Sequence, residues 1–198
     1  MRIIISIFFL FFSKSIFSDE ITDFEINGFS VGISLLEFLN EKEIINKTYY
    51  EIEQGNNKEM GFVNFTDKEI NLNNFFLVKA WYKKNDPKFT IHSLSAFVDI
   101  NDNIDICVDK KNEIVKDIKS VFTNIDPIEE GWVKHDFDHK SKTNTTFFFF
   151  TYSDKTTSFI RVACYDWSQS SGYDDQLRIE IVTEEYYSWL LNVHSELN

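Results

Sequence analysis

The chain has 198 residues, 43% of them hydrophobic, and a formal net charge of −12. This hydrophobic content excludes a disordered chain, and the scarcity of Gly (6) and Pro (2) excludes a low-complexity linker. The negative charge argues against nucleic acid and anionic membrane surfaces as partners, because both would repel the protein.

The N-terminus has the pattern of a secretory signal peptide. One basic residue, Arg2, precedes an apolar run at 3–12, and small residues then allow cleavage after Ser15 or after Ser18. The alternative is a membrane anchor, but a span needs roughly 20 apolar residues and this run is shorter. We therefore predict a signal peptide at 1–18, a periplasmic or secreted protein, and no membrane span after leader cleavage.

Export makes the cysteine count informative. Cys107 and Cys164 are the only two cysteines, so only one intramolecular pairing exists. Closing a loop of this length stabilises a fold by roughly 4 kcal/mol in the chain-entropy model. We predict a disulfide between the second helix and a central strand; the alternative is two buried free thiols.

The first half of the mature chain predicts one helix followed by four strands. A short extended segment at 24–27 leads to Ser30, a candidate N-cap, and apolar residues at helical spacing continue to about residue 46. Turn-rich segments separate the runs that come after it. The strands are predicted at 48–53, 60–66, 75–82 and 89–99.

The second half repeats this order. An apolar stripe predicts a helix at 108–122, and a last helix is predicted at 184–192. The strands between them are predicted at 132–137, 145–152, 158–166 and 176–183. The strand at 176–182 alternates apolar and charged residues, so one face is wet. The four Phe residues at 147–150 require a strand covered on both sides or lying at an interface.

Strands outnumber helices and are grouped between them, which predicts the α+β class. We expect an antiparallel sheet of about eight strands with two to three helices packed on it. Residues 19–198 would form a single domain. Two halves, each a helix followed by four strands, at 19–105 and 106–198, are an open alternative.

Two serines near the N-terminus raise the possibility of hydrolysis. Gly28 to Gly32 matches the pattern G-x-S-x-G around Ser30, and Ser34 lies in a segment similar to the GDSL block of SGNH hydrolases. Ile33 replaces the Asp of that block, and the alternating strand–helix pattern is absent. Helix initiation is the other explanation, so the hydrolase is the alternative function.

The loop at 165–175 is the strongest candidate for ligand binding. It concentrates aromatic rings, acids and hydroxyls between two strands, a composition that suits sugars or cations. The candidate binding residues are Asp166, Trp167, Tyr173, Asp174 and Asp175. The alternative is a connecting loop whose rings cover the core.

The other polar clusters fit turns better than sites. His135 and His139 have a metal-ligand spacing only on a helix, whereas this segment is predicted as a strand end and loop. The acids and amides at 99–105 lack the Gly and Glu of a calcium loop. We therefore assign no catalytic residue, no metal and no cofactor.

Three stretches, 24–36, 107–122 and 162–167, resemble small exported proteins of unknown function from AT-rich marine bacteria. This resemblance covers nearly all of the mature chain and implies no activity. Gly32-Ile33-Ser34 departs from the Gly-Asp-Ser that is usual there. The opening Ile26 to Ser30 is similar to the small lipoprotein module of the outer-membrane barrel-assembly machine and to related inhibitors, which are protein-binding α+β modules.

These features together predict an exported, soluble, non-enzymatic protein of the cell envelope or exterior. It would bind an unknown protein or a small extracellular ligand, and no nucleic acid. The alternative is a small secreted serine hydrolase, esterase-like, that uses Ser30 or Ser34.

Overall fold

The computed structural model describes residues 20–50, 59–100, 103–135, 138–151 and 157–197, with side chains to residue 193. The predicted signal peptide at 1–18 and residues 51–53 of the predicted strand at 48–53 lie outside these residues.

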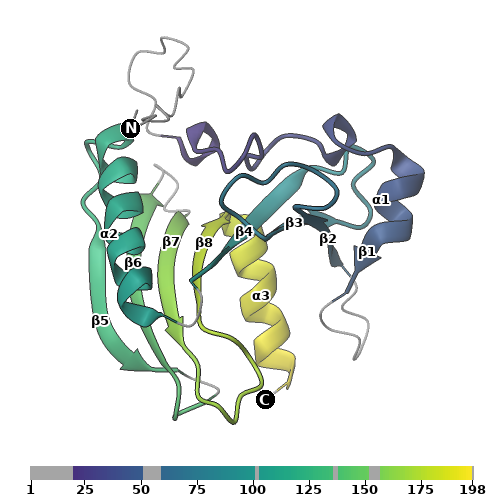
Figure 1. The fold of residues 1–198 in the computed structure, drawn as a ribbon. Coiled ribbons are helices and arrows are strands. Elements are labelled where there is room, and N and C mark those ends of the chain that lie inside the picture. The colour runs from purple at the N-terminus through teal and green to yellow at the C-terminus, as the bar shows by residue number, and fades with distance from the viewer. Residues whose placement is uncertain (1–19, 51–58, 101–102, 136–137, 152–156, 198) are drawn as a thin grey trace, which may run out of the picture.

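Eight antiparallel strands form one sheet in the order β1-β2-β3-β4-β8-β7-β6-β5 (Figure 1). The strands are β1 (Thr48–Tyr49), β2 (Met60–Thr66), β3 (Leu77–Lys83), β4 (Ile91–Asp99), β5 (Ile128–Lys134), β6 (Lys142–Thr151), β7 (Thr157–Asp166) and β8 (Gln176–Val182). Each block of four strands is a meander, and the blocks join where β4 pairs with β8. The predicted α+β class with an antiparallel sheet is confirmed.

Three α-helices accompany the sheet: α1 (Glu41–Lys47), α2 (Ile104–Val121) and α3 (Glu184–Leu197). Alternation along β8 places α2 and α3 on opposite faces, because Ile179 and Ile181 belong to the core beneath α2 and Val182 packs with α3. Figure 1 shows α2 beside β6 and β7, and α1 at the β1 end of the sheet. Within the described residues, no helix has the length and apolar character needed to cross a bilayer.

The predicted disulfide is confirmed. Cys107 of α2 and Cys164 of β7 are bonded, with their Cα atoms 5.9 Å apart. Both residues are fully buried in the core between α2 and the sheet. The bond therefore fastens the helix to a strand near the middle of the second block.

The four consecutive Phe residues lie on β6, one strand in from the edge. Phe148 and Phe150 are buried in the core. Phe147 and Phe149 stack on the other face with ring centroids 5.5 Å apart, and Phe149 is 38% exposed. The strand is therefore fully covered on the face of Phe148 and Phe150, and only partly covered on the face of Phe147 and Phe149.

The predicted helix from Ser30 to residue 46 is wrong. The structure has a 3-10 turn at Leu35–Glu37 and a separate helix, α1, that begins after Asn40 with a capping box. Gly32 has φ +88°, a left-handed conformation that interrupts a helix, and its N–H donates to Ile91 O. The apolar residues of this segment thus cover the core without one continuous helix.

Two further boundaries differ from expectation. The helix predicted from residue 108 begins at Ile104, because the Asn103 side chain caps it by accepting the N–H groups of Asp105 and Ile106. Strand β5 lies at 128–134 instead of 132–137 and contains a bulge between Glu130 and Trp132. The beginning of β5 is exposed and acidic, with Glu129 and Glu130, so it lacks the hydrophobic alternation by which a strand is recognised in a sequence.

Candidate functional site

A pocket of about 550 Å³ opens where β4 ends and β8 begins. These strands are neighbours, and Asp99 at the end of β4 is in register with Gln176 at the start of β8. The lining residues are Phe76, Asp99, Gly172, Tyr173, Asp174, Asp175 and Gln176. The pocket therefore combines three carboxyl groups with two aromatic rings.

The structure brings only some of the predicted binding residues to this pocket. Tyr173, Asp174 and Asp175 line it, whereas Asp166 and Trp167 do not. Trp167 instead positions the pocket, because its backbone N–H donates to Asp175 Oδ1 at 2.7 Å. Asp166 ends β7 and is in register with Lys142.

The sequence prediction missed Phe76, Asp99 and Gln176. They come from the residue just before β3, the end of β4 and the start of β8, which the sheet order brings together. No local pattern in the sequence signals that β4 pairs with a strand so distant along the chain. The short polar turn before Phe76 indicated only a connection between strands.

Both aromatic rings of the pocket are solvent-exposed, and each packs against another aromatic ring. Phe76 is 47% exposed, and its ring centroid lies 6.1 Å from that of Phe97. Tyr173 is 66% exposed, and its ring lies 5.0 Å from Trp167. A ring that is already held by a neighbouring ring loses little side-chain entropy when it binds a ligand.

The supporting rings, Phe97 and Trp167, belong to a row of stacked cations and aromatic rings. We name it the cation–aromatic row: Lys79, Phe97, Arg178, Tyr165 and Trp167. Arg178 Cζ lies 4.8 Å from the Phe97 ring and 4.5 Å from the Tyr165 ring. Lys79 Nζ lies 5.5 Å from Phe97, and Tyr165 stacks on Trp167 at 5.5 Å. A cation–ring contact is favourable by about 0.5–1 kcal/mol at exposed sites and by more where the ring is buried, as Phe97 and Tyr165 are.

An ion network lies beside this row on the same face of the sheet. The Glu180 carboxylate accepts hydrogen bonds from Arg161 and Ser95, and Arg178 Nη1 lies 3.8 Å from it. Burial by itself raises the pKa of Glu180, but the two arginines outweigh that effect and hold the pKa below its usual value. Glu180 therefore anchors Arg178 in the row.

The turn after β5 anchors the loop that follows β7. Asp138 Oδ2 accepts hydrogen bonds from the hydroxyls of Ser141 and Ser168, each at 2.6 Å. These bonds, together with the Lys140 N–H, lower the pKa of Asp138 to about 2. The carboxylate stays ionised at neutral pH and holds the beginning of the pocket loop against the turn.

The histidines near this turn had been considered as metal ligands. In the portion of the chain that the structure describes, no group of three or more His, Cys, Asp and Glu side chains is placed to hold a metal ion. The His135 ring packs against Trp167 with centroids 4.6 Å apart. Among the described atoms, this histidine is thus part of the aromatic support.

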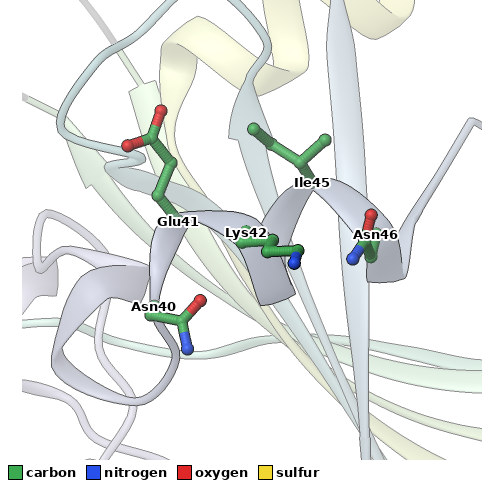
Figure 2. Close-up of a pocket in the computed structure, with 5 residues that line it drawn as sticks. All are labelled: Asn40, Glu41, Lys42, Ile45 and Asn46. Atoms are coloured by element: carbon green, nitrogen blue, oxygen red, sulfur yellow. The ribbon is translucent and has the colours of Figure 1, made fainter.

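A second hollow, of about 380 Å³, lies on α1 and carries no chemistry that we can identify. Figure 2 shows its lining side chains spread along one short helix instead of converging on a point. They are Asn40, Glu41, Lys42, Ile45 and Asn46. The Glu41 carboxylate and the Lys42 ammonium point in different directions (Figure 2).

The two serines considered for hydrolysis are buried or hydrogen-bonded to the backbone. Ser30 is 5% exposed. The Ser34 hydroxyl donates to Lys88 O and accepts from the Leu36 N–H at 3.0 Å. Among the described residues, neither hydroxyl is hydrogen-bonded to a histidine, so no observation favours the hydrolase over the binding site.

Comparison of the chain with protein-family models, with curated proteins and with solved structures finds no match. A function for this chain therefore has to be inferred from the arrangement of its own residues.

Proposed function

We propose that this chain is an exported, non-enzymatic binding protein that holds a small organic cation in the pocket at the ends of β4 and β8. The observation that carries this proposal is the meeting of three carboxyl groups with two exposed rings in one pocket. The carboxyl groups are those of Asp99, Asp174 and Asp175, and the rings are those of Phe76 and Tyr173.

The chemistry of the lining selects the charge of the ligand. Carboxylates attract an ammonium group, and the faces of aromatic rings attract the same charge through their quadrupole. A pocket of about 550 Å³ lies within the size range of small-molecule sites. The net charge of −12 also raises the local concentration of cations and repels anions.

The proposal of export rests on the leader pattern at 1–18 and is supported by the disulfide between Cys107 and Cys164, because such bonds persist in oxidising compartments. N-terminal sequencing of the protein from its own cells tests this. We expect the mature chain to begin at Ile16 or at Asp19. A chain that keeps its leader would overturn the proposal of export.

Titration calorimetry with defined probes tests the binding proposal. Tetramethylammonium and putrescine represent a quaternary and a primary ammonium ion, and citrate is the anionic comparison. We expect the cations to bind and citrate not to bind. If neither cation binds at millimolar concentration, the proposed function is wrong.

Two variants locate the site. Tyr173→Ala removes an exposed ring and Asp174→Asn removes one charge, so each should weaken cation binding by about 5-fold to 30-fold, as expected for losing about 1–2 kcal/mol. Asp126→Asn is the matched control, because its side chain is 94% exposed and outside the pocket lining. Equal binding by all three variants would place the ligand elsewhere.

A further inference from the structure

We propose that a second copy of this chain docks on the outer edge of β5, so that two sheets join through antiparallel β5–β5 pairing. In the sheet of described residues, β5 pairs with β6 on one side and forms the edge on the other. All seven of its residues are exposed. The opposite edge is β1, with only two residues, so β5 offers the longer template.

The exposed side chains of β5 include large apolar groups. Ile128 is 55% exposed, Trp132 is 43% exposed and Val133 is 44% exposed. Charges and bulges discourage pairing at an edge, and β5 carries both at its beginning, with Glu129, Glu130 and a bulge before Trp132, so the segment left for pairing is Trp132 to Lys134. Apolar side chains on an open edge favour contact with another protein.

The backbone of β5 defines one register for this contact. The His135 N–H donates inward to Ser141 O at 3.0 Å. Because residues of an antiparallel strand alternate in direction, Val133 also faces β6, whereas Trp132 and Lys134 direct their N–H and C=O groups outward. Two-fold pairing of these outward groups sets Trp132 opposite Lys134 of the second copy and Val133 opposite its own equivalent.

This register is consistent with the faces of the strand. Trp132 and Lys134 are two residues apart and share one face, so each Lys134 ammonium lies across the interface from an indole ring, twice by symmetry. The bulge between Glu130 and Trp132 lies next to this segment, so we expect the pairing between the two copies to stop at Trp132. The shared ladder is short, which makes the association weak and reversible.

The charges along β5 select a second copy over an unrelated partner. Glu129 and Glu130 lie at the start of the strand, and Lys134 lies at its end, directly opposite Lys142 of β6. Two like charges in that position disfavour each other. In the proposed register Lys134 of one copy is opposite Trp132 of the other, and the acidic start of that second strand is diagonal to Lys134, just past the bulge, where its charge offsets this repulsion.

Sedimentation velocity over a range of protein concentrations tests the proposal. We expect a reversible monomer–dimer equilibrium, at least about 10-fold weaker in Lys134→Glu and in Glu129→Lys. Mixing these two variants should restore the dimer, because each supplies the charge that the other has lost. Lys42→Glu on α1 is the control that leaves the equilibrium unchanged. A wild-type chain that stays monomeric, or a mixture that stays monomeric while both variants are folded, would overturn the proposal.

Cross-linking tests the register separately from the charges. Val133→Cys places two thiols directly opposite each other, at a Cα separation of about 4.5–5.5 Å that suits a disulfide. No described cysteine is free, so the introduced thiol is the one that reacts. We expect rapid formation of a covalent dimer under mild oxidation, and slow formation for the control Ile128→Cys. Equal rates for the two variants would contradict the register.

Discussion

The two faces of the sheet are built from different interactions. The face toward α2 is apolar and is fastened by the disulfide, with Ile179 and Ile181 of β8 in its core. The face toward α3 has a smaller buried hydrophobic cluster of its own, and beside it carries the cation–aromatic row and the ion network, with Arg178 and Glu180 of the same strand. One strand therefore supplies both the stabilising core and the support of the candidate site. Changes to the α2 face should cost the most stability, whereas changes to the charged residues of the α3 face should cost less and should also alter the geometry and charge of the candidate site.

The largest expected effect comes from Phe148 on the α2 face. This ring is fully buried, so Phe148→Ala should lower the free energy of unfolding by about 3–5 kcal/mol through lost burial and a cavity. Phe149→Ala is the matched control on the other face, with an expected loss of about 1 kcal/mol or less, because its ring is 38% exposed. Urea unfolding measures both. Equal losses would show that the faces are packed alike.

The disulfide should come next. The double variant Cys107→Ser, Cys164→Ser should lose about 2–4 kcal/mol, because the bond restricts the unfolded chain between positions separated by 57 residues. Thermal unfolding of the variant, compared with the oxidised wild type, measures this loss. A variant as stable as the oxidised protein would contradict the role assigned to the bond.

Glu180 tests the charged face. Glu180→Gln should cost about 1–3 kcal/mol, because it leaves two arginines without their carboxylate, although both are partly exposed. The lowered pKa of Glu180 adds stability above the usual value of 4.5, and this contribution disappears as the pH falls through the folded-state pKa. The stability difference between wild type and variant should therefore shrink in acid. A difference independent of pH would refute the role of the charge.

The smallest effect should come from Arg178→Lys. It keeps the charge but loses the planar group that lies between Phe97 and Tyr165, so we expect a loss of about 0.5–1 kcal/mol. The same variant should weaken cation binding slightly, because Trp167 and Tyr173 then lose part of their support. A near-ultraviolet circular dichroism spectrum would report the changed packing of the rings. An unaltered spectrum would argue against the row as a rigid support.

Local patterns in the sequence predicted the class of fold well. Two cysteines in a chain with a leader pattern left one pairing, and alternation in 176–182 indicated the two faces of β8. The expectation that the charged face is wet was wrong, because Glu180 is buried and Arg178 lies against two rings. The helix after Ser30 was wrong, because hydrophobic spacing does not reveal that Gly32 adopts a positive φ to pair with Ile91. Contacts with a distant strand overrode the local helical pattern.

The candidate site was predicted only where it lies in one loop. Tyr173, Asp174 and Asp175 are adjacent in sequence, so composition alone drew attention to them. Phe76 and Asp99 reach the pocket through the pairing of β4 with β8. Strand order is a property of the whole chain, and no short motif encodes it.

The pairing of β4 with β8 has a consequence for folding during protein synthesis. The first meander ends with β4, which pairs with β3 on one side and on the other side with β8, the last strand that the structure describes. A nascent protein that emerges from its N-terminus must therefore keep the open edge of β4 unpaired until residues 176–182 have also emerged. During that interval the unpaired edge of β4 is exposed to pairing with other chains, so aggregation should compete with folding until β8 is available.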